Sequence, residues 1–255
     1  MTGRLGGRSI IVTGGGHGIG RAYVRRLAAE GASVLCADLD GAAARRVAGE
    51  ADGGPGRVVA CTTDVTDRDQ VEQMAALAMS EFGAIDGLLN NAGMLNVIPI
   101  SRVPFDQVAE EEWDRVFASN IKSVWLCCRA VVPHMRAARR GSIVNVTSST
   151  FFLGVPTRIH YVASKAAVVG FSRTLARELG PDGIRVNVLS PGSTLSEEDP
   201  APEVVAMRER NARGRALARV EVPEDVVGAA VFFLSDDSAF VTGQTLVVDG
   251  GAYMH

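Results

Sequence analysis

Short apolar runs alternate with longer amphipathic segments along this chain. The runs are rich in β-branched residues and are bounded by glycine, proline and asparagine, which is typical of strands. They lie at 9–14, 33–38, 57–64, 85–93, 141–149, 184–192 and 245–251. Buried apolar runs separated by helices are typical of βαβ units, in which helices cover both faces of a parallel sheet. The pattern therefore predicts an α/β protein with a doubly wound, seven-stranded parallel sheet.

The segments between these runs carry apolar residues three and four positions apart, which is the spacing of one helix face. This pattern predicts helices at about 18–30, 40–50, 67–82, 111–136, 160–180 and 223–234. Val71, Met74, Ala78 and Phe82 illustrate such an apolar stripe. We expect each stripe to pack against the sheet.

The longest stretch without a predicted strand is the acidic, proline-bearing segment at 196–225. It lies between two strands of the same predicted sheet, so a linker between domains does not explain it. We predict one domain over 1–255, with a substrate lid inserted at 194–222.

Composition narrows the class of protein. The 255 residues are 47% hydrophobic and carry a net charge of -3, which is typical of a soluble globular protein. There is no basic block for nucleic acid, no run of ~20 apolar residues for a membrane and no secretory leader, so a cytoplasmic location is expected. Cys36, Cys61, Cys127 and Cys128 have neither disulfide nor metal-site spacing, and no metal site is predicted.

A glycine-rich turn follows the first strand. Gly14, Gly18 and Gly20 allow a tight turn and a close approach of the backbone to a pyrophosphate, at the N-terminus of the next helix. The spacing is not that of the widely used GxGxxG fingerprint. Taken alone, the turn is also compatible with an ordinary tight connection between strand and helix.

Asp38 ends the second strand and bears on the choice of cofactor. Its carboxylate could accept hydrogen bonds from the adenosine ribose and would repel a 2′-phosphate, which favours NAD over NADP. Asp38 could instead cap the following helix, but Asp40 would fill that role equally well. His17 could donate a proton to a phosphate, which is weak support for NADP.

Tyr161 and Lys165 lie four residues apart on one predicted helix. That spacing places them on the same face, about 6 Å apart along the axis. An unperturbed tyrosine has a pKa near ~10, and a neighbouring ammonium or a positively charged nicotinamide would lower it. The phenol could then act as a general base, although an exposed pair on an amphipathic helix would show the same spacing.

With these residues in place, the chain resembles the classical short-chain dehydrogenase/reductase family over essentially its whole length. The shared motifs are the glycine turn from Thr13 to Gly20, the segment Asn90-Asn91-Ala92-Gly93, and Asn120, Ser148 and Tyr161/Lys165, in that order. The resemblance implies a Rossmann-type fold and assigns catalysis to Asn120, Ser148, Tyr161 and Lys165. Thr147 and Ser149 also carry hydroxyls, but only Ser148 has the family's spacing of thirteen residues to Tyr161.

The resemblance also implies a cofactor site. Its residues are Gly14, His17, Gly18, Ile19, Gly20, Asp38, Leu39, Asp64, Val65, Asn91, Ala92, Gly93, Tyr161, Lys165, Pro191, Gly192, Thr194 and Ser196. After Pro191-Gly192 the chain departs from the family pattern, because Thr194 replaces an apolar residue and Ser196 replaces a threonine. Both replacements are small and polar, so we expect nicotinamide binding to be retained.

The substrate pocket is expected to be walled by Met94, Leu95, Asn96, Thr150, Phe151, Phe152, Val155 and Arg158, together with the lid. Its mostly apolar side chains favour a neutral, largely apolar secondary alcohol or ketone. Arg158 could clamp a carboxylate, which makes an anionic substrate the second candidate.

These features predict an NAD-dependent oxidoreductase that acts on a secondary alcohol or the corresponding ketone. One alternative is an NADPH-dependent 3-oxoacyl-thioester reductase, against which Asp38 argues. The other is a dinucleotide-sensing protein without catalysis, which would be expected to have lost one of the four catalytic residues. By resemblance we also expect a homotetramer.

Overall fold

The structure is a computed structural model that describes residues 3–51, 53–95 and 98–254. Seven parallel strands form one sheet, as the sequence predicted. The strand order is β3-β2-β1-β4-β5-β6-β7. The bounds are β1 Ser9–Thr13, β2 Ser33–Asp38, β3 Arg57–Thr62, β4 Gly87–Asn90, β5 Gly141–Val146, β6 Ile184–Pro191 and β7 Thr245–Val248. The order reverses between β1 and β4, which is the point where α/β sheets of this kind bind ligands.

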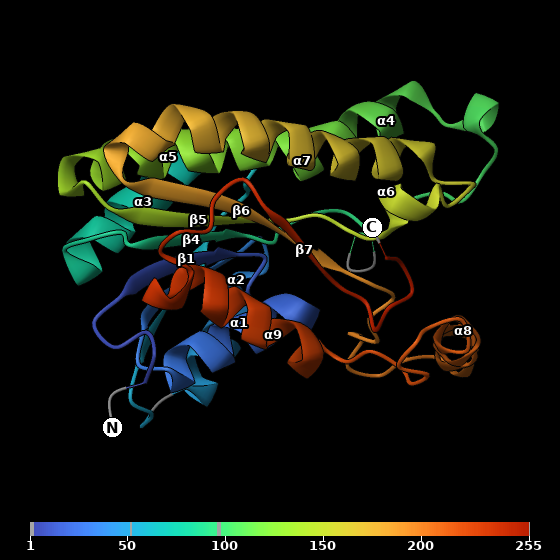
Figure 1. The fold of residues 1–255 in the computed structure, drawn as a ribbon, viewed down its shortest axis with the longest axis horizontal. Coiled ribbons are helices and arrows are strands. Elements are labelled where there is room, and N and C mark those ends of the chain that lie inside the picture. The colour runs from blue at the N-terminus through green and yellow to red at the C-terminus, as the bar shows by residue number, and fades with distance from the viewer. Residues whose placement is uncertain (1–2, 52, 96–97, 255) are drawn as a thin grey trace.

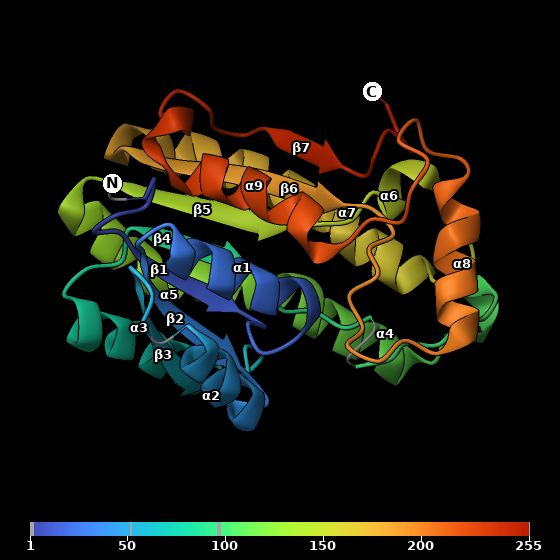
Figure 2. The ribbon, with the colours of Figure 1, turned by 90° about the horizontal axis from the view of Figure 1, so that it is seen from below.

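Helices cover both faces of the sheet (Figure 1; Figure 2). One face carries α1 Gly18–Ala29, α2 Gly41–Glu50 and α9 Pro223–Leu234, and the other carries α3 Arg68–Phe82, α5 Ser123–Ala138 and α7 Ile159–Leu179. Over the described ranges, none of the helices combines the length and the hydropathy that crossing a membrane requires.

Each face of the sheet has its own hydrophobic core. In β1, Ile10 and Val12 belong to the cluster beneath α1 and α9, whereas Ile11 belongs to the cluster beneath α3, α5 and α7. All three side chains are buried, because neighbouring residues of a strand point to opposite faces and both faces are covered. This is why the strands appear in the sequence as continuous apolar runs.

The helix expected at 111–136 is present, but it is not a regular α-helix throughout. It consists of α4 Glu110–Phe117, a π-helical turn at Ala118–Lys122 and α5. Inside the π turn the fully buried Asn120 accepts a hydrogen bond from the Met94 N–H (2.8 Å) and donates one to Ser164 Oγ (3.1 Å). The wider turn thus coincides with a polar side chain bonded on both sides, a placement that apolar periodicity cannot reveal.

The segment at 194–222 contains a helix that the sequence pattern did not indicate, α8 Pro202–Ala212. It lies beyond the ends of the strands, apart from the helices that cover the sheet (Figure 1; Figure 2). Only Ala212 of this helix is buried, so α8 has no apolar stripe of the kind used above to predict helices. A second short helix, α6 Thr150–Leu153, follows β5.

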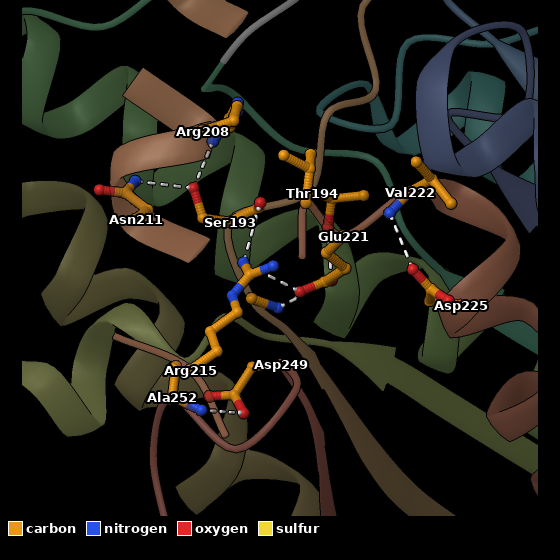
Figure 3. A network of polar contacts seen from close by, with 12 residues as sticks. Ser193, Thr194, Arg208, Asn211, Arg215, Glu221, Val222, Asp225, Asp249 and Ala252 are labelled. Atoms are coloured by element: carbon orange, nitrogen blue, oxygen red, sulfur yellow. Dashed lines mark hydrogen bonds and ion pairs between the residues drawn. The ribbon is translucent and has the colours of Figure 1, made fainter. Parts of the chain in front are cut away.

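A buried ion pair fastens this segment to the end of β6 (Figure 3). Arg215 Nη2 lies 3.3 Å from Glu221 Oε2, with side-chain exposures of 2% and 4%. Glu221 Oε1 also accepts hydrogen bonds from the Gly192 N–H (3.1 Å) and Thr194 Oγ1 (2.6 Å). Arg215 donates in turn to the carbonyl oxygen of Ser193 (3.0 Å). The two ends of the segment are therefore tied to one another and to the loop after β6.

Because both charges are buried, removing one should be costly. We expect Arg215→Met to lower the free energy of unfolding by about 3–5 kcal/mol, the usual cost of leaving a buried charge unpaired. The matched control is Arg219→Met, because Arg219 pairs with Asp225 at 2.6 Å but its side chain is 59% exposed. That variant should lose less than about 1 kcal/mol. If chemical denaturation showed that the two variants lose the same free energy of unfolding, the Arg215–Glu221 pair would not be a stabilising buried pair.

The same variant should show a distinctive pH dependence. Burial raises the pKa of Glu221, against the opposing effects of Thr194 and Arg215, so the folded protein binds this proton more tightly than the unfolded chain does. Without Arg215 the pKa rises further, and protonation then relieves the unpaired charge. The difference in unfolding free energy between Arg215→Met and wild type should therefore shrink as the pH falls through the pKa of Glu221 in the variant. Chemical denaturation at several pH values would measure this change.

Candidate active site

A cavity of about 150 Å³ opens at the carboxyl edge of the sheet, beside the reversal in strand order. Most residues that line it were expected at a site: Ile19, Asn91, Gly93, Met94, Leu95, Ser148, Tyr161, Lys165, Pro191, Gly192, Thr194 and Ser196. Val146, Thr147 and Arg208 complete the lining. The cavity joins the ends of β4, β5 and β6 to the start of α1 and to the segment 194–222.

The glycine turn packs tightly against the segment after β4. Gly14 has a φ of 63°, and a Cβ added to Gly20 would lie 1.8 Å from the Gly14 carbonyl oxygen, so a larger residue cannot occupy position 20 without moving the turn. Asn91 Nδ2 donates to that same oxygen (3.0 Å), and Thr13 Oγ1 accepts the N–H groups of Asn91 and Ala92. The turn leads directly into α1, which presents its first N–H groups as a pyrophosphate site requires.

Asp38 is held at the mouth of this turn by backbone groups. Its carboxylate accepts hydrogen bonds from the N–H of Gly16 (2.8 Å) and of Asp40 (2.9 Å). Asp40, and not Asp38, caps α2, because its side chain accepts from the N–H groups of Ala42 and Ala43. The capping role is thus filled, and the Asp38 carboxylate lies at the end of β2 where an adenosine ribose would bind.

The other residues expected near adenosine do not line the cavity. His17 Nε2 lies 3.2 Å from Asp40 Oδ2, so its ring is engaged with a carboxylate. Asp64 accepts hydrogen bonds from the backbone and side chain of Thr66. Leu39 is 58% exposed, and Val65 packs partly against the α3 face of the core. The cavity lining therefore gives no support for a contact of these four residues with the cofactor.

Three chain segments bring the four expected catalytic side chains together. Tyr161 and Lys165 come from α7, Ser148 follows β5, and Asn120 belongs to the π turn; all four residues are less than 9% exposed. A Cβ on Gly93 would lie 2.9 Å from Asn120 Oδ1 and 3.5 Å from Lys165 Nζ, so glycine at 93 allows the chain to pass between them.

The contacts of the three hydroxyls after β5 favour Ser148 over Thr147 and Ser149. Thr147 Oγ1 donates to the carbonyl oxygen of Lys165 (2.6 Å), so its proton is committed to the backbone. Ser149 does not line the cavity. Ser148 does, and its oxygen accepts a hydrogen bond from Thr150 Oγ1 (3.0 Å), which leaves its own proton free to donate.

The electrostatics of Tyr161 differ from the expectation. Burial raises the pKa of its phenol, and the side chains that lower it are Ser148 through a hydrogen bond and Arg158 and Arg208 through their charges. Lys165 Nζ lies 5.9 Å from the centre of the Tyr161 ring and donates to the Val146 carbonyl oxygen (3.0 Å). Burial also lowers the pKa of Lys165 to about 8. The expected help from Lys165 is thus weakened because the ammonium itself is desolvated.

The contacts of Thr194 and Ser196 explain the two departures from the family pattern after β6. The Thr194 hydroxyl donates to Glu221, so its polarity serves the buried ion pair, while the residue still lines the cavity. Ser196 lies against the glycine turn, where a Cβ on Gly18 would be 3.3 Å from Ser196 Cβ. Ser196 therefore remains beside the candidate cofactor site.

The expected apolar wall is absent from the cavity lining. Of the substrate residues predicted, Met94 and Leu95 line the cavity, whereas Thr150, Phe151, Phe152, Val155 and Arg158 do not, and Asn96 lies outside the described residues. Phe152 instead stacks on Tyr253 near the C-terminus, with ring centres 4.4 Å apart. Phe151 and Phe152 therefore pack on one another, and Phe152 also packs on the C-terminal tail.

The charged lining residue Arg208 was missed by the sequence analysis. Arg208, on α8, points to the loop after β6: Nη1 donates to Ser193 Oγ (2.8 Å) and Nη2 to Glu197 Oε1 (3.1 Å), as Figure 3 shows for Ser193. In the sequence the segment 194–222 has acidic and basic residues in similar numbers, so its net charge did not indicate which of them would face the cavity. Arg215 and Glu221 were missed for the same reason.

Comparisons with known proteins agree with this geometry. The family model described as enoyl-(acyl carrier protein) reductase matches residues 14–253. The chain is 38% identical over 253 residues to the 3-oxoacyl-(acyl-carrier-protein) reductase FabG of Thermotoga maritima, covering 97% of this chain and 98% of the relative. It is 35% identical over 253 residues to the cyclopentanol dehydrogenase of Comamonas testosteroni, covering 98% of both.

A solved structure has the same fold. It is a protein of Sinorhizobium meliloti 1021 thought to be a short-chain alcohol dehydrogenase, which superposes with a TM-score of 0.90 at 32% identity over 97% of each chain. The matches extend over nearly the whole chain and include the glycine turn, the segment after β4 and the Tyr161/Lys165 helix. The chain therefore belongs to the short-chain dehydrogenase/reductase family of oxidoreductases.

Proposed function

We propose that the protein transfers a hydride between NAD and a secondary alcohol or the corresponding ketone. The family uses nicotinamide cofactors. The observation that carries the proposal is the meeting of Tyr161, Ser148 and Lys165 in one cavity beside the glycine turn and the Pro191-Gly192 loop. The glycine turn and the backbone-held Asp38 fit the pyrophosphate and ribose of such a cofactor.

The side chains would divide the proton chemistry among them. Bound nicotinamide supplies the hydride acceptor or donor. The Tyr161 phenolate takes the hydroxyl proton of the alcohol, and the Ser148 hydroxyl donates a hydrogen bond to the reacting oxygen. Lys165 keeps a positive charge near the ring below its pKa of about 8. Asn120 accepts a hydrogen bond from the Met94 N–H and donates one to Ser164, and it thereby positions Met94 in the cavity lining.

A second candidate function, reduction of 3-oxoacyl thioesters, is favoured by the relative named a 3-oxoacyl-(acyl-carrier-protein) reductase. Another relative is named for cyclopentanol, so the relatives do not agree on one substrate. Asp38 favours NAD over NADP, because a 2′-phosphate would approach a carboxylate that two N–H groups hold in place. The cofactor preference therefore separates the two candidates.

We propose that the segment 194–222 is a lid over the cofactor, within a single domain. The acidic start of this segment reaches two helices at the other end of the chain, because Glu198 pairs with Arg21 on α1 (3.2 Å) and with Arg46 on α2 (2.8 Å). We also propose a homotetramer that pairs α5 and α7 with their counterparts. The 46% exposure of Trp125 on α5 is compatible with such an interface.

The role of Tyr161 can be tested by removing its hydroxyl. Tyr161→Phe should lower kcat by 10²-fold or more, the usual effect of losing an acid–base group, while NADH binding measured by fluorescence stays close to wild type. Tyr23→Phe is the matched control, since Tyr23 is fully buried and its hydroxyl has no hydrogen-bond partner in the described part of the chain. If Tyr161→Phe kept more than about a tenth of the activity, Tyr161 would not be the base.

Cofactor choice can be tested at Asp38. The wild type should prefer NAD over NADP by at least ~10-fold in kcat/KM, equivalent to about 1.4 kcal/mol, and Asp38→Ala should narrow or reverse that ratio. Asp69→Ala removes an exposed carboxylate from α3, on the other face of the sheet, and should leave the ratio unchanged. Equal use of both cofactors by the wild type would rule out this role for Asp38 and favour the thioester reductase.

A further inference from the structure

The part of the cavity that faces the lid is basic. Arg208 belongs to its lining together with Ser148, Tyr161 and Lys165, and its side chain is only 11% exposed. Two of its nitrogens are bonded to Ser193 and Glu197, which fix the plane of the guanidinium. Its Nε is buried and has no hydrogen-bond partner within the described ranges. One donor of a well-positioned arginine is therefore unused.

Arg158 is a second arginine whose charge acts on Tyr161, although Arg158 does not itself line the cavity. It directly precedes α7, three residues before Tyr161, and its Nε is likewise buried without a partner among the described residues. No carboxylate in the described part of the chain lies within ion-pair distance of Arg158. Its charge, unlike that of Arg208, is thus not compensated by a neighbour.

The charges of the two arginines act on each other and on the base. Burial lowers the pKa of Arg158, and the nearby positive charges of Arg102 and Arg208 lower it further. Arg158 and Arg208 both lower the pKa of the Tyr161 phenol. Two guanidinium groups therefore act on the phenol, Arg102 adds a further positive charge beside Arg158, and Glu197 pairs with Arg208. Such a concentration of like charge is unfavourable unless an anion joins it.

We propose that the substrate carries an anionic group, a carboxylate or a phosphate, which Arg158 and Arg208 bind beside Tyr161. This inference rests on the proposed function and specifies its substrate class. Guanidinium groups bind oxyanions through paired N–H donors, and the two unused Nε–H groups would both gain a partner. Leaving a buried donor unpaired costs about 1–3 kcal/mol, which a bound oxyanion would offset.

The proposal replaces the neutral substrate that the sequence favoured. That expectation relied on an apolar wall of Phe151, Phe152 and Val155, none of which lines the cavity. Because Arg208 lines the same cavity as Tyr161, the anionic group would lie close to the carbinol carbon. Short hydroxy acids, oxo acids and their phosphorylated counterparts fit this description.

The test measures binding, so that it does not depend on turnover. Butyrate, butyl phosphate and butyramide are titrated calorimetrically into the full-length protein saturated with NADH. At least one of the two anions should bind 10-fold or more tightly than the isosteric amide, and the stronger anion identifies the group. Arg158→Met and Arg208→Met should each weaken anion binding at least 10-fold and leave butyramide binding unchanged.

Arg210→Met is the matched control, because Arg210 is exposed on the same helix as Arg208 and does not line the cavity. It should bind the anions like wild type. Equal binding of anions and amide by the wild type, or an unchanged affinity in both Arg158→Met and Arg208→Met, would overturn the proposal. NADH titration and the Tyr161→Phe comparison test the proposed function separately, so an oxidoreductase without an anion site would be recognised as such.

Discussion

All strands of the sheet run in the same direction, and this constraint places the site. Parallel strands end at a common edge, so Asp38 at the end of β2, Asn91 after β4, Ser148 after β5 and Gly192 after β6 gather there although they are far apart in the sequence. The reversal of strand order between β1 and β4 opens the space between them. Helix α7 then brings Tyr161 and Lys165 to the same edge.

Burial governs the chemistry at this edge more than any single charge pair. It raises the pKa of Tyr161 and lowers that of Lys165 to about 8, because removing water disfavours the charged form of each group. A phenol in such surroundings needs other positive charges or hydrogen-bond donors to serve as a base at neutral pH. The protein supplies these in Ser148, Arg158 and Arg208. The groups that we propose to bind the substrate anion therefore also act on the base.

The position of the proposed lid depends on a buried ion pair between Arg215 and Glu221. Glu221 receives donors from Gly192, Thr194 and Arg215, so the carboxylate joins the loop after β6 to both ends of the segment that carries α8. Arg208 and Asn211 of α8 donate to the Ser193 hydroxyl in the same loop. The position of Arg208 at the cavity is thus fixed by the loop that also lines the cavity, and this contact connects the proposed substrate site to the proposed cofactor site.

The sequence by itself determined the sheet, most helices and the residues that meet at the site. These follow from local rules: apolar periodicity set by the strand and helix repeats, glycines required by the turn, and motifs whose order matches a family. The π turn at Asn120, the helix α8 and the Arg215–Glu221 pair were decided only by the tertiary structure. In each case polar side chains find partners outside their own helix or turn, and neither periodicity nor composition records such pairings. The same reason explains why Arg208, one charge among many in the lid, was recognised as part of the cavity only once the chain had folded.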